Sequence, residues 1–326
     1  MRNSNRFVFP EERFLMRRAR HPIPKLDAPI ILVHGIFMRD ENETCWGRIP
    51  AWLREAGNAV YMSHTAACLP VSANAEMLAE RIAEVRDETG ASKVHLIGFS
   101  QGGLESRRCA ENPLCASSIA SVTTICSPHG GSFMAENGFA MLPNSIIRGV
   151  SWAADQRACW MGDDRPDAYE TFRTLSQSYE SDVFASSDLG AKAVHYDKTP
   201  VSANVDVHKP YCQSYALASR KPRIHCFLRS AETPNDGLVS VRSAQWADYR
   251  GCFFPLERQS AHQGRDFKHS NMTDECMLDI DLGFLDGCNN TCMEIGGIRE
   301  AWGLMIGNLP GDSCERAGRQ HTSWLA

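Results

Sequence analysis

Short apolar runs alternate, along the first half of the chain, with longer stretches whose apolar residues recur at helical spacing. The runs are rich in β-branched residues and are typical of strands buried on both faces. They cover residues 29–34, 60–62, 93–97 and 121–125. Because strands and helices alternate at this spacing, the pattern predicts an α/β fold with a mostly parallel central sheet flanked by helices.

Helices are expected over residues 45–56, 74–89 and about 101–112. The second has apolar residues three or four positions apart, which places them on one face of a helix; they are Ala75, Leu78, Ile82 and Val85. Ser72 or Asn74 is available as its N-cap, and Gly90 as its end.

The alternation breaks over about 133–200 and resumes with strand candidates at 211–217, 223–228 and 251–254. We therefore expect one α/β domain over 29–326, interrupted by a cap or lid insertion, after an irregular proline-punctuated lead-in at 1–28. Within the insertion, apolar residues at helical spacing predict a short amphipathic helix; they are Ile146, Ile147 and Val150. A lid of this kind covers an apolar groove in water, whereas the alternative is a permanently packed cap.

Composition narrows the function classes. The 326 residues are 43% hydrophobic and 22% charged, as expected for a folded globular protein, and the net charge of −5 argues against a nucleic-acid partner. No apolar run approaches the roughly 18 residues of a membrane helix. The first twenty residues show no apolar core of a secretion signal. With 13 cysteines, an odd number, these features favour a reduced protein in the cytoplasm.

Cysteine pairs offer only weak metal candidates. Cys109 with Cys115, and Cys288 with Cys292, have no neighbouring histidine or second pair to complete a tetrahedral set at the usual spacing. A redox or metal protein of the Cys/His type is therefore not favoured.

The pentapeptide Gly98-Phe99-Ser100-Gln101-Gly102 is the strongest chemical signal. It lies between a predicted strand and a predicted helix, which is the setting of a nucleophile elbow. The flanking glycines permit a sharp turn that holds the serine hydroxyl at the helix N-terminus. We therefore expect Ser100 to be a nucleophile, the alternative being an ordinary glycine turn.

A serine nucleophile needs a base and an orienting carboxylate, in the chain order serine, acid, histidine for this layout. Asp236, in a Pro-Asn-Asp-Gly turn after a predicted strand, is the acid candidate, with Asp206 and Asp248 as weaker ones. His269 and His262 both follow it, and spacing alone does not choose between them.

Among the histidines that precede the acid candidate in the chain are His34, His95 and His129. Their order argues against a role as the base. We expect the first and last to shape loops, and His95 to be a satisfied histidine in or beside the sheet.

An oxyanion hole needs two backbone N–H groups. One is expected from Gln101, which follows the nucleophile. The other is assigned to Ile36, in the loop after the first central strand, where Gly35 lets the backbone turn in.

These segments together resemble the bacterial triacylglycerol lipases of the α/β-hydrolase fold. The similar segments are 29–35, 94–103, 123–132 and 235–241, followed by His269 ahead of a predicted helix. The resemblance implies that His269, and not His262, is the catalytic base. One departure is Phe99, which stands where the family commonly has histidine.

The resemblance also raises the question of calcium. Family members often hold a structural Ca²⁺ through a carboxylate two residues after the catalytic histidine, and Asn271 stands there, with Asp274 and Glu275 beyond it. An amide oxygen can bind Ca²⁺, but losing the charge weakens such a site. A calcium ion near Asn271 and Glu275 is therefore an open expectation, and no other cofactor is expected.

The expected function is serine-dependent hydrolysis of carboxylic esters, with a triacylglycerol lipase as the leading interpretation. The substrate would then be an ester or lipid, met at a lipid–water interface, and no nucleic acid or transmembrane segment is involved. Alternatives are a carboxylesterase, polyesterase or thioesterase with the same triad, or a non-catalytic binding protein of hydrolase fold.

Overall fold

The computed structural model describes residues 22–40, 44–132, 135–136, 141–176, 209–217, 235–236, 238–253 and 298–309. The strands are β1 (Ile30–Val33), β2 (Val60–Met62), β3 (Val94–Phe99), β4 (Ile119–Ile125), β5 (Tyr211–Leu217) and β6 (Asp248–Phe253). The helices are η2 (Thr44–Trp46), α1 (Ile49–Glu55), α2 (Val71–Thr89), α3 (Gln101–Glu111), α4 (Pro113–Ala116), α6 (Asn144–Trp160), α7 (Ala168–Thr174) and α10 (Ile298–Gly307).

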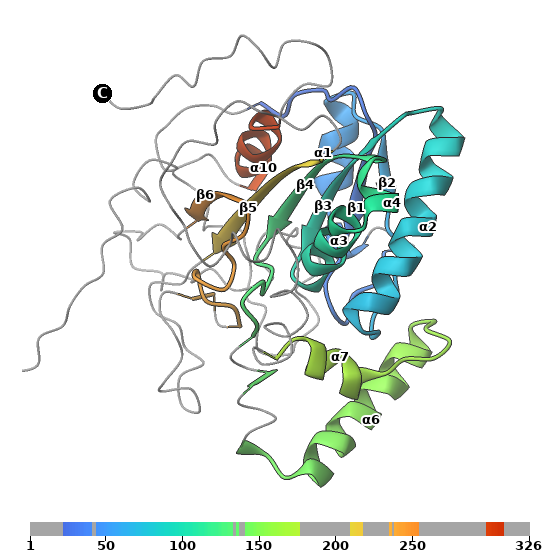
Figure 1. Ribbon diagram of the computed structural model, residues 1–326, viewed down its shortest axis with the longest axis vertical. Coiled ribbons are helices and arrows are strands. Elements are labelled where there is room, and N and C mark those ends of the chain that lie inside the picture. The colour runs from blue at the N-terminus through green and yellow to red at the C-terminus, as the bar shows by residue number, and fades with distance from the viewer. Residues whose placement is uncertain are drawn as a thin grey trace, which may run out of the picture.

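The six strands form one sheet in the order β2-β1-β3-β4-β5-β6, and every neighbouring pair is parallel (Figure 1). The order reverses at β1, because β2 lies on its outer side and β3 on its inner side. In an open α/β sheet, ligands bind outside the carboxyl ends of the strands near such a reversal. The predicted parallel α/β architecture is confirmed.

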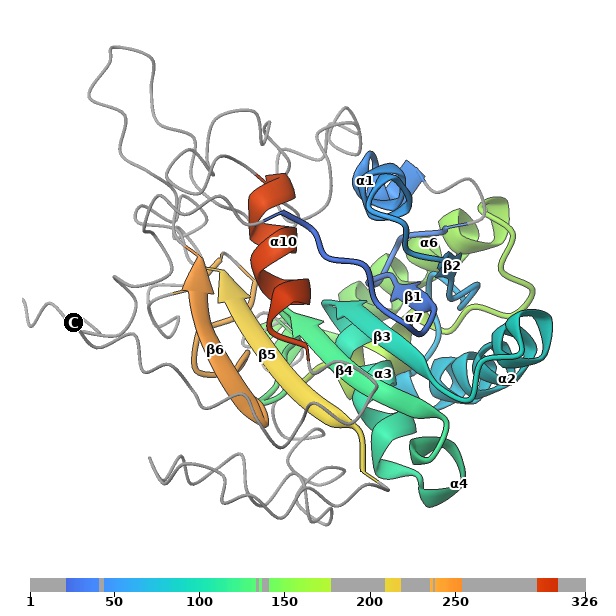
Figure 2. The same ribbon diagram turned by 90° about the horizontal axis from the view of Figure 1, so that it is seen from above.

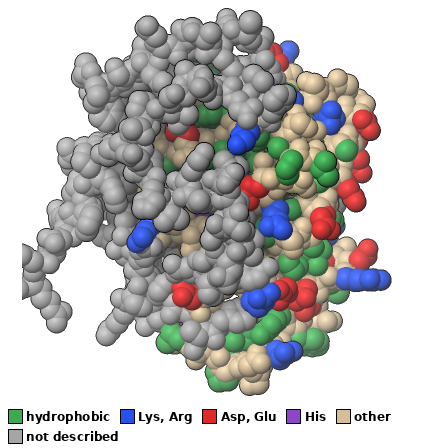
Figure 3. Space-filling model, viewed as in Figure 1, with side chains coloured by type: hydrophobic (Ala, Val, Ile, Leu, Met, Phe, Trp, Pro, Cys, Tyr) green, Lys and Arg blue, Asp and Glu red, His purple; other side chains and the backbone are tan. Residues whose placement is uncertain are grey.

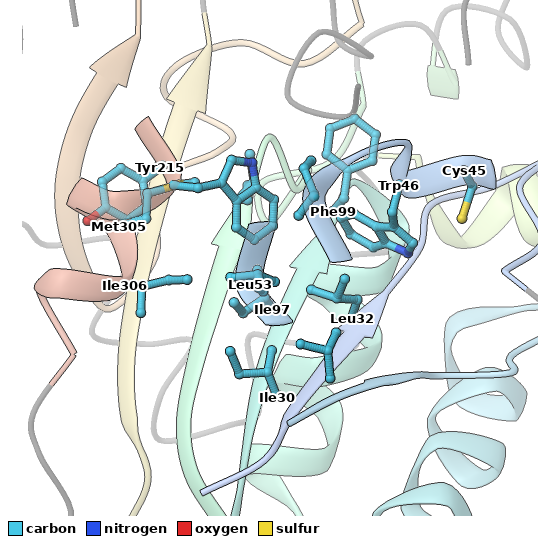
Figure 4. Packing of buried hydrophobic residues seen from close by; sticks show 14 of the residues in the cluster. Ile30, Leu32, Cys45, Trp46, Leu53, Ile97, Phe99, Tyr215, Met305 and Ile306 are labelled. Carbon is cyan, nitrogen blue, oxygen red and sulfur yellow. The ribbon is translucent and has the colours of Figure 1, made fainter. Parts of the chain in front are cut away.

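Helices cover both faces of the sheet (Figure 2). Strand side chains alternate between the faces, so Ile30 and Leu32 pack in one apolar cluster with α1 and α10. Ile31 and Val33 pack in another with α2 and α3. Figure 4 shows the first cluster, in which Trp302 of α10 meets Trp46 edge to face at 6.1 Å between ring centroids.

Helix α2 corrects one detail of the sequence interpretation. The helix begins at Val71 with Pro70 at its N-cap position, so neither Ser72 nor Asn74 caps it. Asn74 instead has its side chain buried inside the protein, where it bonds to other segments. The expected end is confirmed, since Gly90 has a φ of 67°, the left-handed conformation that glycine adopts without strain.

In the second half of the chain, β5 occupies the predicted range, whereas β6 begins at 248 rather than 251. The strand predicted over 223–228 lies outside the described residues. The predicted helix of the insertion is present as α6 and is longer than expected (Figure 1). Residues 1–21 also lie outside the description, so the lead-in and domain boundaries stay predictions.

A buried aspartate of the insertion bonds directly to the sheet domain. The carboxylate of Asp163, between α6 and α7, accepts the backbone N–H groups of Ala67 at 3.0 Å and Cys68 at 2.9 Å. The same buried carboxylate forms an ion pair with Arg39. Cys68 also packs in an apolar cluster with Ala158 and Ala168 of the insertion.

Most of α6 faces outward. Hydrophobic side chains are visible at the end of the molecule formed by α6 (Figure 3), and those exposed here are Met141, Leu142, Ile146, Val150, Trp152 and Trp160. Ile147, in contrast, is buried. Among the described residues, no helix is long and apolar enough to cross a membrane.

Candidate active site

The backbone at Ser100 is strained in the way a nucleophile elbow requires. Ser100 has a φ of 54° and a ψ of −122°, a conformation that residues with a Cβ rarely adopt. Its N–H donates to the carbonyl of Ile125 at 2.9 Å, and its own carbonyl accepts from Gly103 at 3.1 Å. Ser100 thus stands between the end of β3 and the start of α3, as predicted, and only 7% of its surface is exposed.

Glycines allow β1 and its following loop to lie directly against the elbow. A Cβ at Gly102 would stand 2.2 Å from the carbonyl oxygen of Val33 and 2.3 Å from that of His34. A Cβ at Gly35 would stand 2.9 Å from the Cβ of Ser100. The loop after β1, where the sequence predicts the oxyanion loop, therefore packs directly against the serine.

The backbone N–H groups of that loop have different partners. Phe37 donates to the carbonyl of Ala67 at 2.8 Å, and Met38 donates to that of Gly35 at 3.3 Å. Within the described residues, the N–H of Ile36 makes no such bond. Gln101 opens α3, so its N–H has no partner inside the helix. Both expected donors are thus placed on segments that adjoin Ser100.

Asp236 lies at the same edge of the sheet. It is buried, and its Oδ1 accepts the N–H groups of Leu238 at 2.9 Å and Val239 at 2.8 Å. Its carboxylate reaches Cys126, which directly follows β4; burial, and next the charge of Asp236, raise the pKa of that thiol well above its ordinary value. Ser100 follows β3, and Asp236 contacts Cys126, which follows the neighbouring strand β4. Both residues therefore lie at the carboxyl ends of adjacent strands.

The other candidate acids and histidines take other roles or cannot be placed. Asp248 opens β6 at the opposite end of the sheet and accepts the Tyr211 hydroxyl at 2.8 Å, so the structure does not bring it to Ser100. Asp206, His262 and His269 lie outside the described residues, as do Asn271 and Glu275 of the calcium expectation. Among the described residues, no group of three potential ligands could hold a metal ion.

His34, His95 and His129, which precede Asp236 in the chain, each bond or stack with neighbouring residues. His95 lies in β3 with Nδ1 2.7 Å from the Ser121 hydroxyl. His129 stacks on Trp246 with 5.0 Å between ring centroids, and burial lowers its pKa well below the ordinary value. His34 places Nδ1 2.9 Å from the carbonyl oxygen of Gly35, which shapes the loop beside Ser100.

A buried polar cluster that the sequence did not predict lies next to Gln101 and consists of Glu105, Asn74 and Gln101. Glu105, one helical turn after Gln101, is 1% exposed. Its Oε1 accepts the amide N–H groups of Asn74 at 2.8 Å and Gln101 at 3.1 Å. Burial raises the pKa of Glu105 to about 7. The only sequence signal was its i+4 spacing from Gln101, and such a glutamate is usually solvent-exposed.

Parallel topology, a strained serine between β3 and α3, and a loop after β1 packed against that serine are the features of an α/β-hydrolase. A solved structure supports this class. That of a metagenomic carboxyl esterase superposes with a TM-score of 0.57 over 90% of this chain and 78% of that chain, at 14% sequence identity. At this identity the similarity shows the fold.

Two sequence relatives are bacterial triacylglycerol lipases. A triacylglycerol lipase of Pseudarthrobacter phenanthrenivorans is 38% identical over 114 residues, which are 33% of this chain and 35% of that lipase. A triacylglycerol lipase of Pseudomonas fragi is 36% identical over 128 residues, or 38% and 43% of the two chains. The predicted resemblance to bacterial triacylglycerol lipases is thus confirmed over the matched residues, which span less than half of either relative.

A second family also matches. Residues 29–172, from β1 through α6 into α7, fit the palmitoyl protein thioesterase family. The match includes the oxyanion loop and the elbow and stops before Asp236.

Proposed function

We propose that this protein hydrolyses carboxylic esters through a triad of Ser100, Asp236 and His269. The observation that carries the proposal is the left-handed backbone of Ser100 with the oxyanion loop packed against it. Such strain is costly unless the surrounding structure enforces it, and it occurs mainly at functional sites. The similarity to triacylglycerol lipases supports the same reaction class.

In the proposed reaction, the Ser100 hydroxyl oxygen attacks the ester carbonyl carbon while His269 takes the hydroxyl proton. The carbonyl oxygen becomes negative and accepts the N–H groups of Ile36 and Gln101. Collapse of this intermediate breaks the bond to the alcohol, which leaves with the proton from His269. Water then attacks the acyl-serine by the same sequence and releases the acid. Asp236 orients the histidine and stabilises its charged form.

The proposed substrates are triacylglycerols. The names of the matched lipases support them, and so do the exposed apolar side chains of α6, which suit a surface that meets lipid. The insertion would then act as a lid, with the Asp163 contact as its fixed base. The location of the protein in the cytoplasm and a calcium ion near Asn271 and Glu275 stay predictions.

A thioesterase is the second candidate, because residues 29–172 match a palmitoyl protein thioesterase family. The same nucleophile, base and oxyanion donors would serve, with a thiolate leaving in place of an alcohol. Oxygen esters and thioesters of equal acyl length, assayed over a series of lengths, separate the two candidates by kcat/KM.

The experiment that tests the triad compares the wild type with Ser100→Ala and with His269→Ala and His262→Ala. Losing the nucleophile should cut kcat by about 10⁶-fold, and a phosphonate ester should label Ser100 alone. His269→Ala should nearly abolish turnover, whereas His262→Ala should leave most of it. Robust hydrolysis by folded Ser100→Ala would end the proposal, and the reverse histidine pattern would transfer the role of base to His262.

A further inference from the structure

Glu105 is a buried carboxyl group that the proposed reaction does not use. It lies on α3 one turn after Gln101 and is 1% exposed. Its Oε1 has two donors, the side-chain amides of Asn74 and Gln101. Its Oε2 is equally buried, and no donor reaches it within the described part of the chain. A buried carboxylate with an unpaired oxygen is expensive, so this arrangement needs a physical explanation.

The partners of Glu105 connect the segments that carry the two oxyanion donors. The Gln101 amide that binds Glu105 also donates to the carbonyl of Leu69 at 2.8 Å. Asn74 exchanges two hydrogen bonds with the backbone of Ala66, at 2.9 and 3.1 Å. The adjoining carbonyl of Ala67 accepts the N–H of Phe37 in the oxyanion loop. Glu105 thus joins the first turn of α3 to segment 66–69, and that segment supports the loop.

A proton on Glu105 would supply the donor that two buried oxygen atoms lack. The Oε1 of Gln101 is also buried and has no donor among the described residues. A carboxylic acid offers one donor and one acceptor side by side, and so does a primary amide. Protonated Oε2 can therefore donate to Gln101 Oε1 while Gln101 Nε2 donates to Glu105 Oε1. The ionised carboxylate offers no such donor.

We propose that Glu105 is a positioning residue for the oxyanion hole and works in its protonated form. The neutral acid pairs with the Gln101 side chain and fixes the first turn of α3 against segment 66–69. It thereby holds the backbone N–H groups of Gln101 and Ile36 in register. The catalytic consequence rests on the proposed function, whereas the protonation itself does not.

The electrostatic surroundings support the protonated form. Burial raises the pKa of Glu105 to about 7, against the smaller opposing effects of His34 and of the Asn74 and Gln101 amides. The charge of Asp40, in the loop after β1, makes a smaller contribution in the same direction as burial, and Cys109 on α3 also interacts with the carboxylate. Above neutral pH the carboxylate would place a negative charge one turn of α3 from Gln101, whose N–H is an expected oxyanion donor.

The consequence is an alkaline decline in activity that the triad alone would not produce. A histidine base must be neutral, so it accounts for loss of activity at acid pH. Ionised Glu105 repels the developing oxyanion and loses its pairing with Gln101, so kcat should fall as the pH rises through about 7. KM should change little, because the oxyanion donors act mainly on the transition state.

The decisive variant is Glu105→Gln, because its amide offers the same donor and acceptor as the acid but does not ionise. At about pH 6 its kcat should lie within about twofold of the wild type, and at about pH 9 it should exceed the wild type about tenfold. Glu105→Ala should be weaker at every pH. The matched control is Glu76→Gln, an exposed position on α2, which should keep the wild-type profile.

A second measurement needs no activity. Because the folded-state pKa of Glu105 is raised, its contribution to stability is present below about pH 4.5 and is lost as the pH rises to about 7. The wild type should therefore lose unfolding free energy over this interval relative to Glu105→Gln. Infrared difference spectra should show a protonated carboxyl band that titrates near pH 7 in the wild type and is missing in Glu105→Gln.

The two measurements separate the two proposals. Parallel pH profiles of stability, with no titrating carboxyl band, would overturn the role of Glu105 even if Ser100 proves essential. An alkaline decline of kcat that persists unchanged in Glu105→Gln would overturn it as well. If the protein hydrolyses no ester but the carboxyl band and the stability difference are found, the proposed function fails and the protonated pairing stands.

Discussion

Helices α3 and α6 show opposite relations between composition and burial. Helix α3 reads Gln-Gly-Gly-Leu-Glu-Ser-Arg-Arg-Cys-Ala-Glu, and nine of its 11 residues are buried, Glu105 and Arg107 among them. Helix α6 has 17 residues, of which three are buried, although it carries Ile146, Val150 and Trp152. The polar helix is inside and the more apolar helix is outside. Burial here follows the position of a helix relative to the sheet, not its average hydrophobicity.

Buried polar groups on α3 and exposed apolar groups on α6 have different physical requirements. Every buried polar group on α3 needs a defined partner, as Arg107 has in Glu111 at 2.8 Å, and this fixes the helix precisely behind Ser100. Those apolar side chains of α6 are instead exposed to water, and an exposed apolar patch is unfavourable unless it binds something. The precise positioning of Ser100 and an exposed apolar surface are thus supplied by two separate helices.

The largest expected effect is the loss of close packing at α3. Gly102→Ala would drive a Cβ into the backbone oxygens of Val33 and His34, at 2.2 and 2.3 Å. Neither strand β1 nor α3 can move without disturbing Ser100, so the variant should lose more than about 4 kcal/mol or fail to fold. Chemical denaturation measures the loss. A variant with wild-type stability and activity would show that α3 does not lie this close to β1.

Removing the fixed base of the insertion should have the next largest effect. Asp163→Ala leaves Arg39 and the backbone N–H groups of Ala67 and Cys68 without their acceptor, and should cost about 3 kcal/mol. Because segment 66–69 supports the oxyanion loop, kcat should fall too. The matched control is Asp164→Ala at the neighbouring exposed position. Equal stability of the two variants would mean that the insertion is not held there.

The exposed face of α6 can be tested with little cost in stability. Ile146→Ser combined with Val150→Ser changes two side chains that are 48% and 54% exposed, so unfolding should shift by less than about 1 kcal/mol. If this face meets lipid, activity on a medium-chain triglyceride should no longer rise steeply beyond the substrate's solubility limit. Hydrolysis of a soluble short-chain ester should persist.

A control for that double variant is Ile147→Ser, which changes the buried neighbour. It should destabilise the insertion without selectively affecting the interfacial rise. Smooth saturation of the wild type through the solubility limit would make the protein an esterase with a packed cap.

The smallest expected effect is a gain in stability, opposite to the loss expected for Gly102→Ala. Gly149→Ala on α6 adds a methyl group where nothing lies within 4 Å, so it should stabilise the protein by about 0.5–1 kcal/mol through helix propensity. Thermal unfolding checks the shift against Gly102→Ala, the same substitution on α3. A loss of stability at Gly149 would show that α6 packs against more than the described residues.

The strand–turn–helix setting of Ser100 and the parallel sheet could be predicted because each has a local signature. Ser100 stands between a strand run and a helix start, and the strand runs have the composition of buried strands. The Glu105 cluster could not be predicted, since its bonds join residues 31 positions apart or depend on burial that no local pattern reveals. Asn74 is an example: its residue type predicts a helix N-cap, but its buried side chain donates a hydrogen bond to Glu105 instead.

The attachment of the insertion to the sheet domain could not be predicted from the sequence either. Its helix is visible in the spacing of Ile146 and Val150, but the residue that fastens it, Asp163, lies 95 positions from Cys68 along the chain. An aspartate between two helices predicts nothing by itself. Pairings of this length depend on the final topology, which a single sequence does not specify.

The attachment through Asp163 has a consequence for evolution and for engineering. The carboxylate is contributed by the insertion, while its cation, Arg39, and the two N–H groups that it accepts belong to the sheet domain. A graft that moves the segment around α6 into another hydrolase must therefore carry the arginine with it, or leave a buried acid unmatched. In such hybrids Asp163 and Arg39 would have to be changed together, although they lie far apart in the sequence, and a library that varies only the insertion could not do so.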